Sequence, residues 1–144
     1  MINIKKPLLA ALDIDPTKYI SRLNKYYWIE GCKYILFVNR IVFADSFPKI
    51  LDDIGHDGKS YPFNSNYLII VIAPTHEQFD KKDLYYERDL GENVVFVLYN
   101  ETKRTVFYST AFNFPLRFSY RKITRKIAGI ILELMNQKAI TKNS

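Results

Sequence analysis

Two nearly continuous apolar segments constrain the fold of this chain more than any other feature. Residues 66–73 and 94–99 each have the length of a strand and are dominated by Ile, Val and Leu. Strands of this kind are usually buried on both faces, as in a parallel sheet covered by helices. Between them, Thr75 and Gln78 have the spacing of a helix capping box, and apolar residues follow at helical spacing. Residues 66–99 therefore predict a right-handed β-α-β unit with parallel strands.

The segments before and after this unit predict further helices and strands. Asp15 and Pro16 suit a helix start, and apolar residues at helical spacing predict a helix from there to Gly31. The other expected elements are a short helix at 8–14, a strand at 33–44, a helix at 46–54 closed by Gly55, a turn at 100–104 leading to an antiparallel strand at 105–112, and a long helix at 120–139. This order predicts a single α/β domain over residues 1–144, with a mixed sheet of four or five strands and helices packed on its faces.

Chain length, apolar run length and cysteine content indicate the cellular location to expect. A chain of 144 residues is long enough for one core. Its apolar runs are shorter than the roughly 18 residues that a membrane-spanning helix needs, and the first residues do not resemble a signal peptide. Cys32 is the only cysteine, so no disulfide can form within the chain. We therefore expect a soluble, cytoplasmic protein that does not contact membranes.

The sequence contains none of the common motifs for cofactor or metal chemistry. The five glycines form neither a dinucleotide-binding nor a P-loop pattern, and no nucleophile-elbow motif is present. Two histidines and one cysteine do not suffice for the usual structural zinc sites. His76 and Glu77 begin like H-E-x-x-H, but Asp80 stands in place of the second histidine, and acidic residues at a helix start are common. We expect no cofactor and no metal, and an enzyme is not favoured.

A weaker set of candidate catalytic residues comes from the topology. Ligands of open α/β sheets bind at the carboxyl ends of parallel strands. Asp45, Glu77 and Glu101 follow the predicted strands and could together hold Mg²⁺ for phosphodiester cleavage. Glu101 and Lys103 also form an E-x-K triplet that resembles the motif of restriction-endonuclease-like enzymes, although here it falls in a predicted turn. A magnesium-dependent nuclease that uses Asp45, Glu77, Glu101 and Lys103 is therefore one alternative.

Charge is distributed unevenly along the chain. Residues 45–93 carry a net charge of −5, and the rest of the chain carries +11. The sharpest feature is a set of four cations opposite the isoleucine face of the last predicted helix, together with Arg117 just upstream of it. These residues are here called the basic stripe: Arg117, Arg121, Lys122, Arg125 and Lys126. Cations near a helix start oppose the helix dipole, and like charges four residues apart repel. An arrangement that is unfavourable for the helix itself has two explanations. Either the cations are solvated and nearby acidic residues offset their charge, or they form a docking site.

These features lead to a primary hypothesis and further alternatives. The primary hypothesis is a small, non-enzymatic accessory or adaptor protein, bacterial or phage in type, whose basic stripe docks a polyanionic partner. Nucleic acid is the first candidate for that partner, and an acidic protein surface is the second. An immunity-type protein that neutralises a partner protein, through aromatic residues or the acidic segment 77–92, is an alternative. Opposite charge patches also make a homo-oligomer conceivable.

Overall fold

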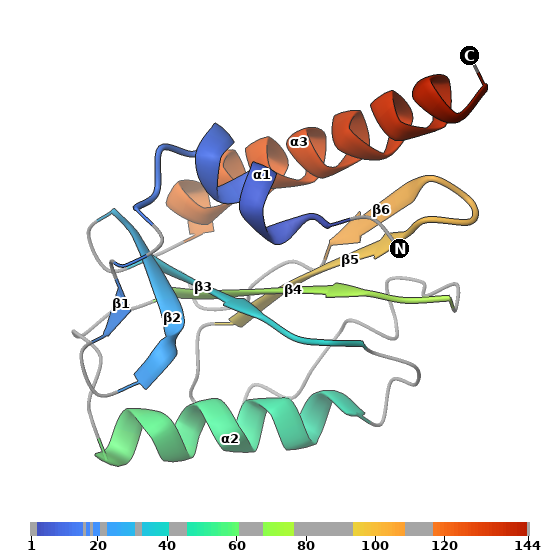
Figure 1. Ribbon diagram of the computed structural model, residues 1–144. Helices are drawn as coiled ribbons and strands as arrows, with labels where there is room; N and C mark the ends of the chain where they lie inside the picture. The colour runs from blue at the N-terminus through green and yellow to red at the C-terminus, as the bar shows by residue number, and fades with distance from the viewer. Residues whose placement is uncertain are drawn as a thin grey trace.

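A computed structural model shows a mixed β-sheet with helices on both of its faces (Figure 1). It describes residues 3–15, 17, 19–20, 23–30, 33–40, 46–60, 68–76, 94–108 and 117–143. The described elements are α1 (Lys5–Ala11), β1 (Tyr19–Ile20), β2 (Leu23–Glu30), β3 (Lys33–Phe37), α2 (Ser46–Ser60), β4 (Leu68–Pro74), β5 (Val94–Asn100), β6 (Thr105–Tyr108) and α3 (Arg117–Asn143). The predicted α/β class, with a mixed sheet and helices on its faces, is confirmed.

The centre of the sheet is parallel, as the two apolar segments predict. β4 pairs in parallel with both β3 and β5, and Ile70 stands opposite Ile35 on one side and Val95 on the other. All three of these side chains are fully buried. Because successive side chains of a strand point to opposite faces, β4 and β5 contribute to two separate cores. One core lies under α1 and α3 and the other lies against α2, so the sheet is the middle layer of three (Figure 1).

The predicted helix from Asp15 to Gly31 is wrong. Residues 19–20 and 23–30 form β1 and β2, which extend the sheet: β2 pairs antiparallel with β3, and β1 pairs antiparallel with β2. Asp15 does not cap a helix; its Oδ1 accepts hydrogen bonds from the backbone N–H of Thr17, at 2.9 Å, and from the Thr17 hydroxyl, at 2.8 Å. Aromatic residues that satisfy a helical spacing also suit a strand, and the neighbouring β3 decides between the two. With both added strands, the sheet has six strands among the described residues instead of four or five.

Helix α2 is longer than its sequence predicts. It runs through Gly55 to Ser60, whereas Gly55 was expected to end it. Leu51 and Ile54 are buried against the sheet, and Asp57 is held by β2. This packing outweighs the roughly 1 kcal/mol that each of the two glycines within the helix, Gly55 and Gly58, costs. Of the strand predicted at 33–44, β3 accounts for residues 33–37, and residues 41–44 lie outside the described residues. Of the helix predicted from Thr75 to Gly91, residues 75–76 are not helical, and the remainder lies outside the described residues.

Helix α1 ends in a Schellman motif that contains a non-glycine residue. The N–H of Asp13 donates to the carbonyl oxygen of Ala10 at 3.1 Å, and the N–H of Ile14 donates to that of Leu9 at 2.9 Å. Leu9 and Ile14 are both buried in the same core, which completes the motif with its usual apolar contact. Asp13 adopts a left-handed conformation with φ of 55°. That conformation is strained for any residue that has a Cβ atom.

Replacing Asp13 with glycine is expected to stabilise the protein. Glycine adopts positive φ without strain, and the Asp13 side chain is exposed, so little packing is lost. The free energy of unfolding should rise by about 0.5–1 kcal/mol, since greater freedom of the unfolded chain offsets part of the relieved strain. Urea denaturation of the wild type and of Asp13→Gly measures the difference. An Asp13→Ala variant, which keeps the Cβ atom, should show no such gain.

The last two predicted elements are confirmed with shifted ends. β6 pairs antiparallel with β5 in a hairpin, with Asn100 opposite Thr105. α3 starts three residues before the predicted 120 and ends four residues after 139. Its apolar face packs on the sheet, with Ile127, Ile131 and Met135 buried. No helix in the described part of the chain combines the length and the apolar character needed to cross a membrane.

Candidate polyanion-binding face

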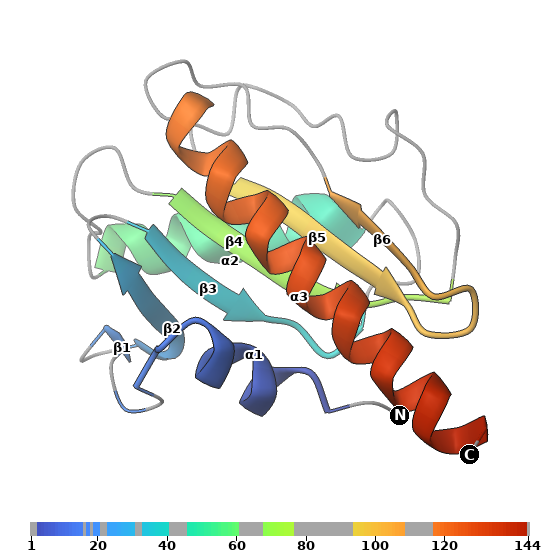
Figure 2. The ribbon, with the colours of Figure 1, turned by 90° about the horizontal axis from the view of Figure 1, so that it is seen from above.

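Helix α3 lies on the outside of the three-layer arrangement. It crosses β4 and β5 diagonally, and its C-terminal turns extend past the sheet (Figure 2). Its inner face contacts β5, β6 and α1. Arg121, Lys122, Arg125 and Lys126 are all exposed, whereas Thr124, Ile127 and Ala128 between and after them are buried. These four residues of the basic stripe therefore lie on the outer face of α3, as their sequence pattern predicts, whereas the side chain of Arg117 is outside what the structure describes.

The net charge of the protein is concentrated in this one helix. Residues 117–143 contain seven lysines and arginines and a single acidic residue, Glu133, which gives α3 a net charge of +6. The rest of the chain contains fourteen basic and fourteen acidic residues, so the helix accounts for the entire net charge of +6. Overall basicity that merely reflected composition would be spread over the surface. Outside α3, the excess of cations in residues 1–44 and 94–116 is cancelled by the acidic segment 45–93, so α3 carries the largest uncompensated positive charge.

The cations of the stripe are placed close to one another. Arg121 and Arg125, and likewise Lys122 and Lys126, are four residues apart on the same exposed face. Each like-charge pair of this kind costs a few tenths of a kcal/mol. Within the described residues, none of these four side chains takes part in an ion pair. The acidic residues of 77–92, which were expected as one way to offset the stripe, lie outside the described residues.

The observed start of α3 changes which cations are affected by the helix dipole. Because the helix begins at Arg117, that residue is in its first turn, and Arg121 already belongs to the second turn. The unfavourable effect of the helix dipole falls off within the first turn. It therefore bears on Arg117 more than on the other four residues, and mutual repulsion is the larger cost of the stripe.

Two further residues on the outer face of α3, Gly129 and Leu132, follow the cations and were not identified from the sequence. Gly129 is exposed one turn after Arg125 and Lys126, and a Cβ atom built at Gly129 would meet nothing within 4 Å. Leu132, one turn further, is 39% exposed and is among the few large apolar side chains exposed in the described part of the chain. A glycine in the middle of a long predicted helix was the available sequence signal. That glycine becomes a candidate binding residue only because the structure shows that position 129 faces outward.

Two of the four candidate catalytic residues, Glu101 and Lys103, are among the described residues. Asp45 and Glu77 lie outside them. Glu101 is half-buried in the β5–β6 turn and Lys103 is exposed there, so the E-x-K triplet is in the turn that its sequence predicts. The N–H of Lys103 donates to Asn100 Oδ1 at 3.1 Å, a contact that shapes the turn. Among the described residues, no three His, Cys, Asp or Glu side chains form a group that could hold a metal ion.

The described residues that follow the carboxyl ends of β3, β4 and β5 include more basic than acidic side chains. Beyond the ends of β3, β4 and β5, the exposed Arg40, His76 and Arg104 accompany Glu101. Burial, together with the negative charge of Glu101, raises the pKa of Tyr99 to about 12. The Tyr99 phenol therefore stays protonated at neutral pH. Cys32, the single cysteine of the chain, lies outside the described residues.

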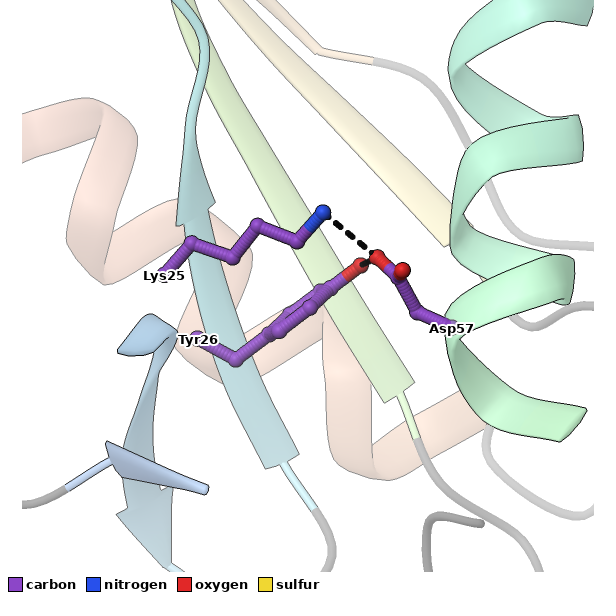
Figure 3. Close-up of polar contacts among 3 residues, drawn as sticks. All are labelled: Lys25, Tyr26 and Asp57. Carbon is purple, nitrogen blue, oxygen red and sulfur yellow. Dashed lines mark hydrogen bonds and ion pairs between the residues drawn. The ribbon is translucent and has the colours of Figure 1, made fainter. Parts of the chain in front are cut away.

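A cluster of three polar side chains, Lys25, Tyr26 and Asp57, joins β2 to α2. The Tyr26 hydroxyl donates to Asp57 Oδ2 at 2.5 Å, and Lys25 Nζ lies 2.7 Å from the same oxygen (Figure 3). Tyr26 is fully buried, and the Asp57 side chain is 14% exposed. A carboxylate held by both a phenol and an ammonium group is positioned to tie the helix to the sheet. We assign this cluster a structural role.

Comparisons with known protein families, with curated proteins and with solved structures found no match.

Proposed function

We propose that this protein is a non-enzymatic accessory protein that docks the phosphate backbone of nucleic acid on the basic stripe of α3. The observation that carries the proposal is the net charge of +6 on this one helix, which equals the net charge of the whole chain because the charges of the other segments cancel. Arg121, Lys122, Arg125 and Lys126 present that charge outward, without ion pairs among the described residues. Phosphate docking would neutralise the repulsion between these cations and release counterions from the nucleic acid.

The density of charge on α3 favours nucleic acid over an acidic protein surface. The four cations lie within residues 121–126, which span about 7.5 Å of helix axis at 1.5 Å per residue. That is about one positive charge per 2 Å, close to the one negative charge per 1.7 Å of a DNA duplex. Binding through phosphates alone would depend little on base sequence. The proposal includes the cytoplasmic location predicted from the sequence, since nucleic acid is present there.

A salt titration of duplex binding tests the proposal. Short duplex DNA should bind at about 50 mM salt, and the logarithm of the affinity should fall linearly with the logarithm of the salt concentration. With four or five phosphates neutralised, a slope of about −4 is expected, because each contributes roughly −0.9. Fluorescence anisotropy with labelled duplex measures both quantities. The same titration with labelled polyglutamate is the control, and it should show weaker binding than the duplex.

Three results would contradict this function. Absence of duplex binding at about 50 mM salt would overturn phosphate docking. Tighter binding of polyglutamate than of DNA would favour an acidic protein partner. Cleavage of the duplex that appears only with Mg²⁺ would replace the non-enzymatic function with the nuclease alternative.

A further inference from the structure

The outer face of α3 has a gap in its side-chain cover directly beside the cations. Gly129 is exposed, and the position that its Cβ atom would take is open space to at least 4 Å. Arg125 and Lys126 stand one turn before it, and two exposed residues, Leu132 and Glu133, stand one turn after it. The Glu133 carboxylate accepts a hydrogen bond from Gln137 Nε2 at 3.4 Å, on the side away from Gly129 along the helix. Bare helical backbone is therefore accessible between a charged turn and an exposed leucine.

Side-chain direction makes this gap part of the cationic surface. The Cα–Cβ bonds of a helix tilt toward its N-terminus, so each side chain covers the turn that precedes its own Cα atom. A side chain at position 129 would accordingly lie over the turn that carries Arg125 and Lys126. Glycine leaves that turn uncovered, so the surface between these two cations and Leu132 stays open.

Neither packing nor helix stability explains a glycine at this position. Any residue up to the size of the open space would fit, since nothing approaches the Cβ position. A glycine in a helix interior is less stable than alanine because it loses more backbone freedom on folding. Close approach of a ligand to the backbone is a role in which glycine has no substitute.

We infer that Gly129 is the point at which the sugar-phosphate backbone of a nucleic-acid duplex comes closest to α3. This inference rests on the proposed function, and it adds where the duplex lies on the helix. Arg125 and Lys126 contact phosphates on the N-terminal side of Gly129, and Leu132 packs on sugar atoms on the other side. The stripe therefore continues through Gly129 to Leu132 instead of ending at Lys126.

Substitutions at Gly129 test the inference because stability and affinity should move in opposite directions. Gly129→Ala and Gly129→Leu should each raise the midpoint of thermal unfolding by about 2–4 °C, since both residues favour a helix. Gly129→Leu should weaken binding of short duplex DNA at about 50 mM salt by about tenfold or more, comparable to losing one hydrogen bond to a charged group. Gly129→Ala should weaken it less. Asn136→Leu, at an exposed position two turns further on, is the matched control and should bind like the wild type.

The outcomes separate this inference from the proposed function. If Gly129→Leu binds duplex DNA as well as the wild type does, the backbone does not approach Gly129 and the inference is wrong. Arg121→Glu/Arg125→Glu would still lose binding in that case, and the proposed function would stand. If the wild type itself does not bind the duplex, both are overturned. Equal weakening by Gly129→Leu and Asn136→Leu would also contradict a specific contact at Gly129.

Discussion

Replacing both Arg121 and Arg125 with glutamate is expected to weaken binding of short duplex DNA about 100-fold or more, because two phosphate contacts are lost and two repulsive charges are added. The slope of affinity against salt should fall in magnitude by about 2, since roughly one unit belongs to each neutralised phosphate. The fold should be unaffected. Both side chains are exposed, and a glutamate at position 125 gains Lys122, three residues away, as an opposite charge.

The control for this variant is a second double charge reversal on helices other than α3. Lys6 on α1 and Lys49 on α2 are exposed, and their replacement by glutamate lowers the net charge from +6 to +2, as the stripe variant does. If binding follows net charge alone, the two double variants will lose equal affinity, and docking on α3 is contradicted. If α3 is the docking face, the Lys6→Glu/Lys49→Glu variant will keep most of the affinity. Circular dichroism of both variants verifies that each is folded.

The parallel centre of the sheet was predictable because its residues allow few alternatives. A strand buried on both faces must be apolar at every position, and residues 68–73 and 95–98 satisfy that requirement. The long amphipathic helix was predictable for a similar reason, since its buried positions recur at regular spacing. Both patterns are set by local composition and need no knowledge of neighbouring segments.

The segment at 19–31 was predicted wrongly because its sequence fits two structures. Tyr26 and Tyr27 are adjacent and both are buried, one toward α2 and the other toward α1 and α3. Burial of consecutive residues is natural in a strand between two layers, but the second layer cannot be inferred from this segment alone. Similarly, helix α2 passes through Gly55 because of contacts with the sheet that its own residues do not reveal.

The basic stripe was identified from sequence, whereas its extension through Gly129 was not. Four charged residues opposite an isoleucine face determine their own exposure once the helix is recognised. An isolated glycine carries no such information, because its significance depends on whether the space above it is empty. That space is defined by the packing of α3 on the sheet and by the neighbouring turns of the helix.

The largest stability effect is expected for Tyr26→Ala. Tyr26 is fully buried between β2 and α2, and its hydroxyl is bonded to Asp57. Removing the ring leaves a cavity and takes away one of the partners of Asp57 Oδ2, so the free energy of unfolding should fall by about 3–5 kcal/mol. Tyr26→Phe keeps the ring and removes only the hydrogen bond to a charged group, for which about 1.5–3 kcal/mol is expected. Urea denaturation measures both.

Alanine substitutions at the aromatic residues next to Tyr26 test whether residues 23–30 form a strand. Trp28 is 41% exposed on β2, so Trp28→Ala should cost clearly less than Tyr26→Ala. Tyr27→Ala should cost nearly as much as Tyr26→Ala, since the Tyr27 ring is buried on the opposite face of the sheet and packs edge-on against Phe37, with ring centroids 5.9 Å apart. In a surface helix, adjacent side chains differ by about 100° in direction, and a single apolar stripe would not bury both fully. High costs at both Tyr26 and Tyr27 would therefore support a strand between two cores, and a low cost at either would contradict it.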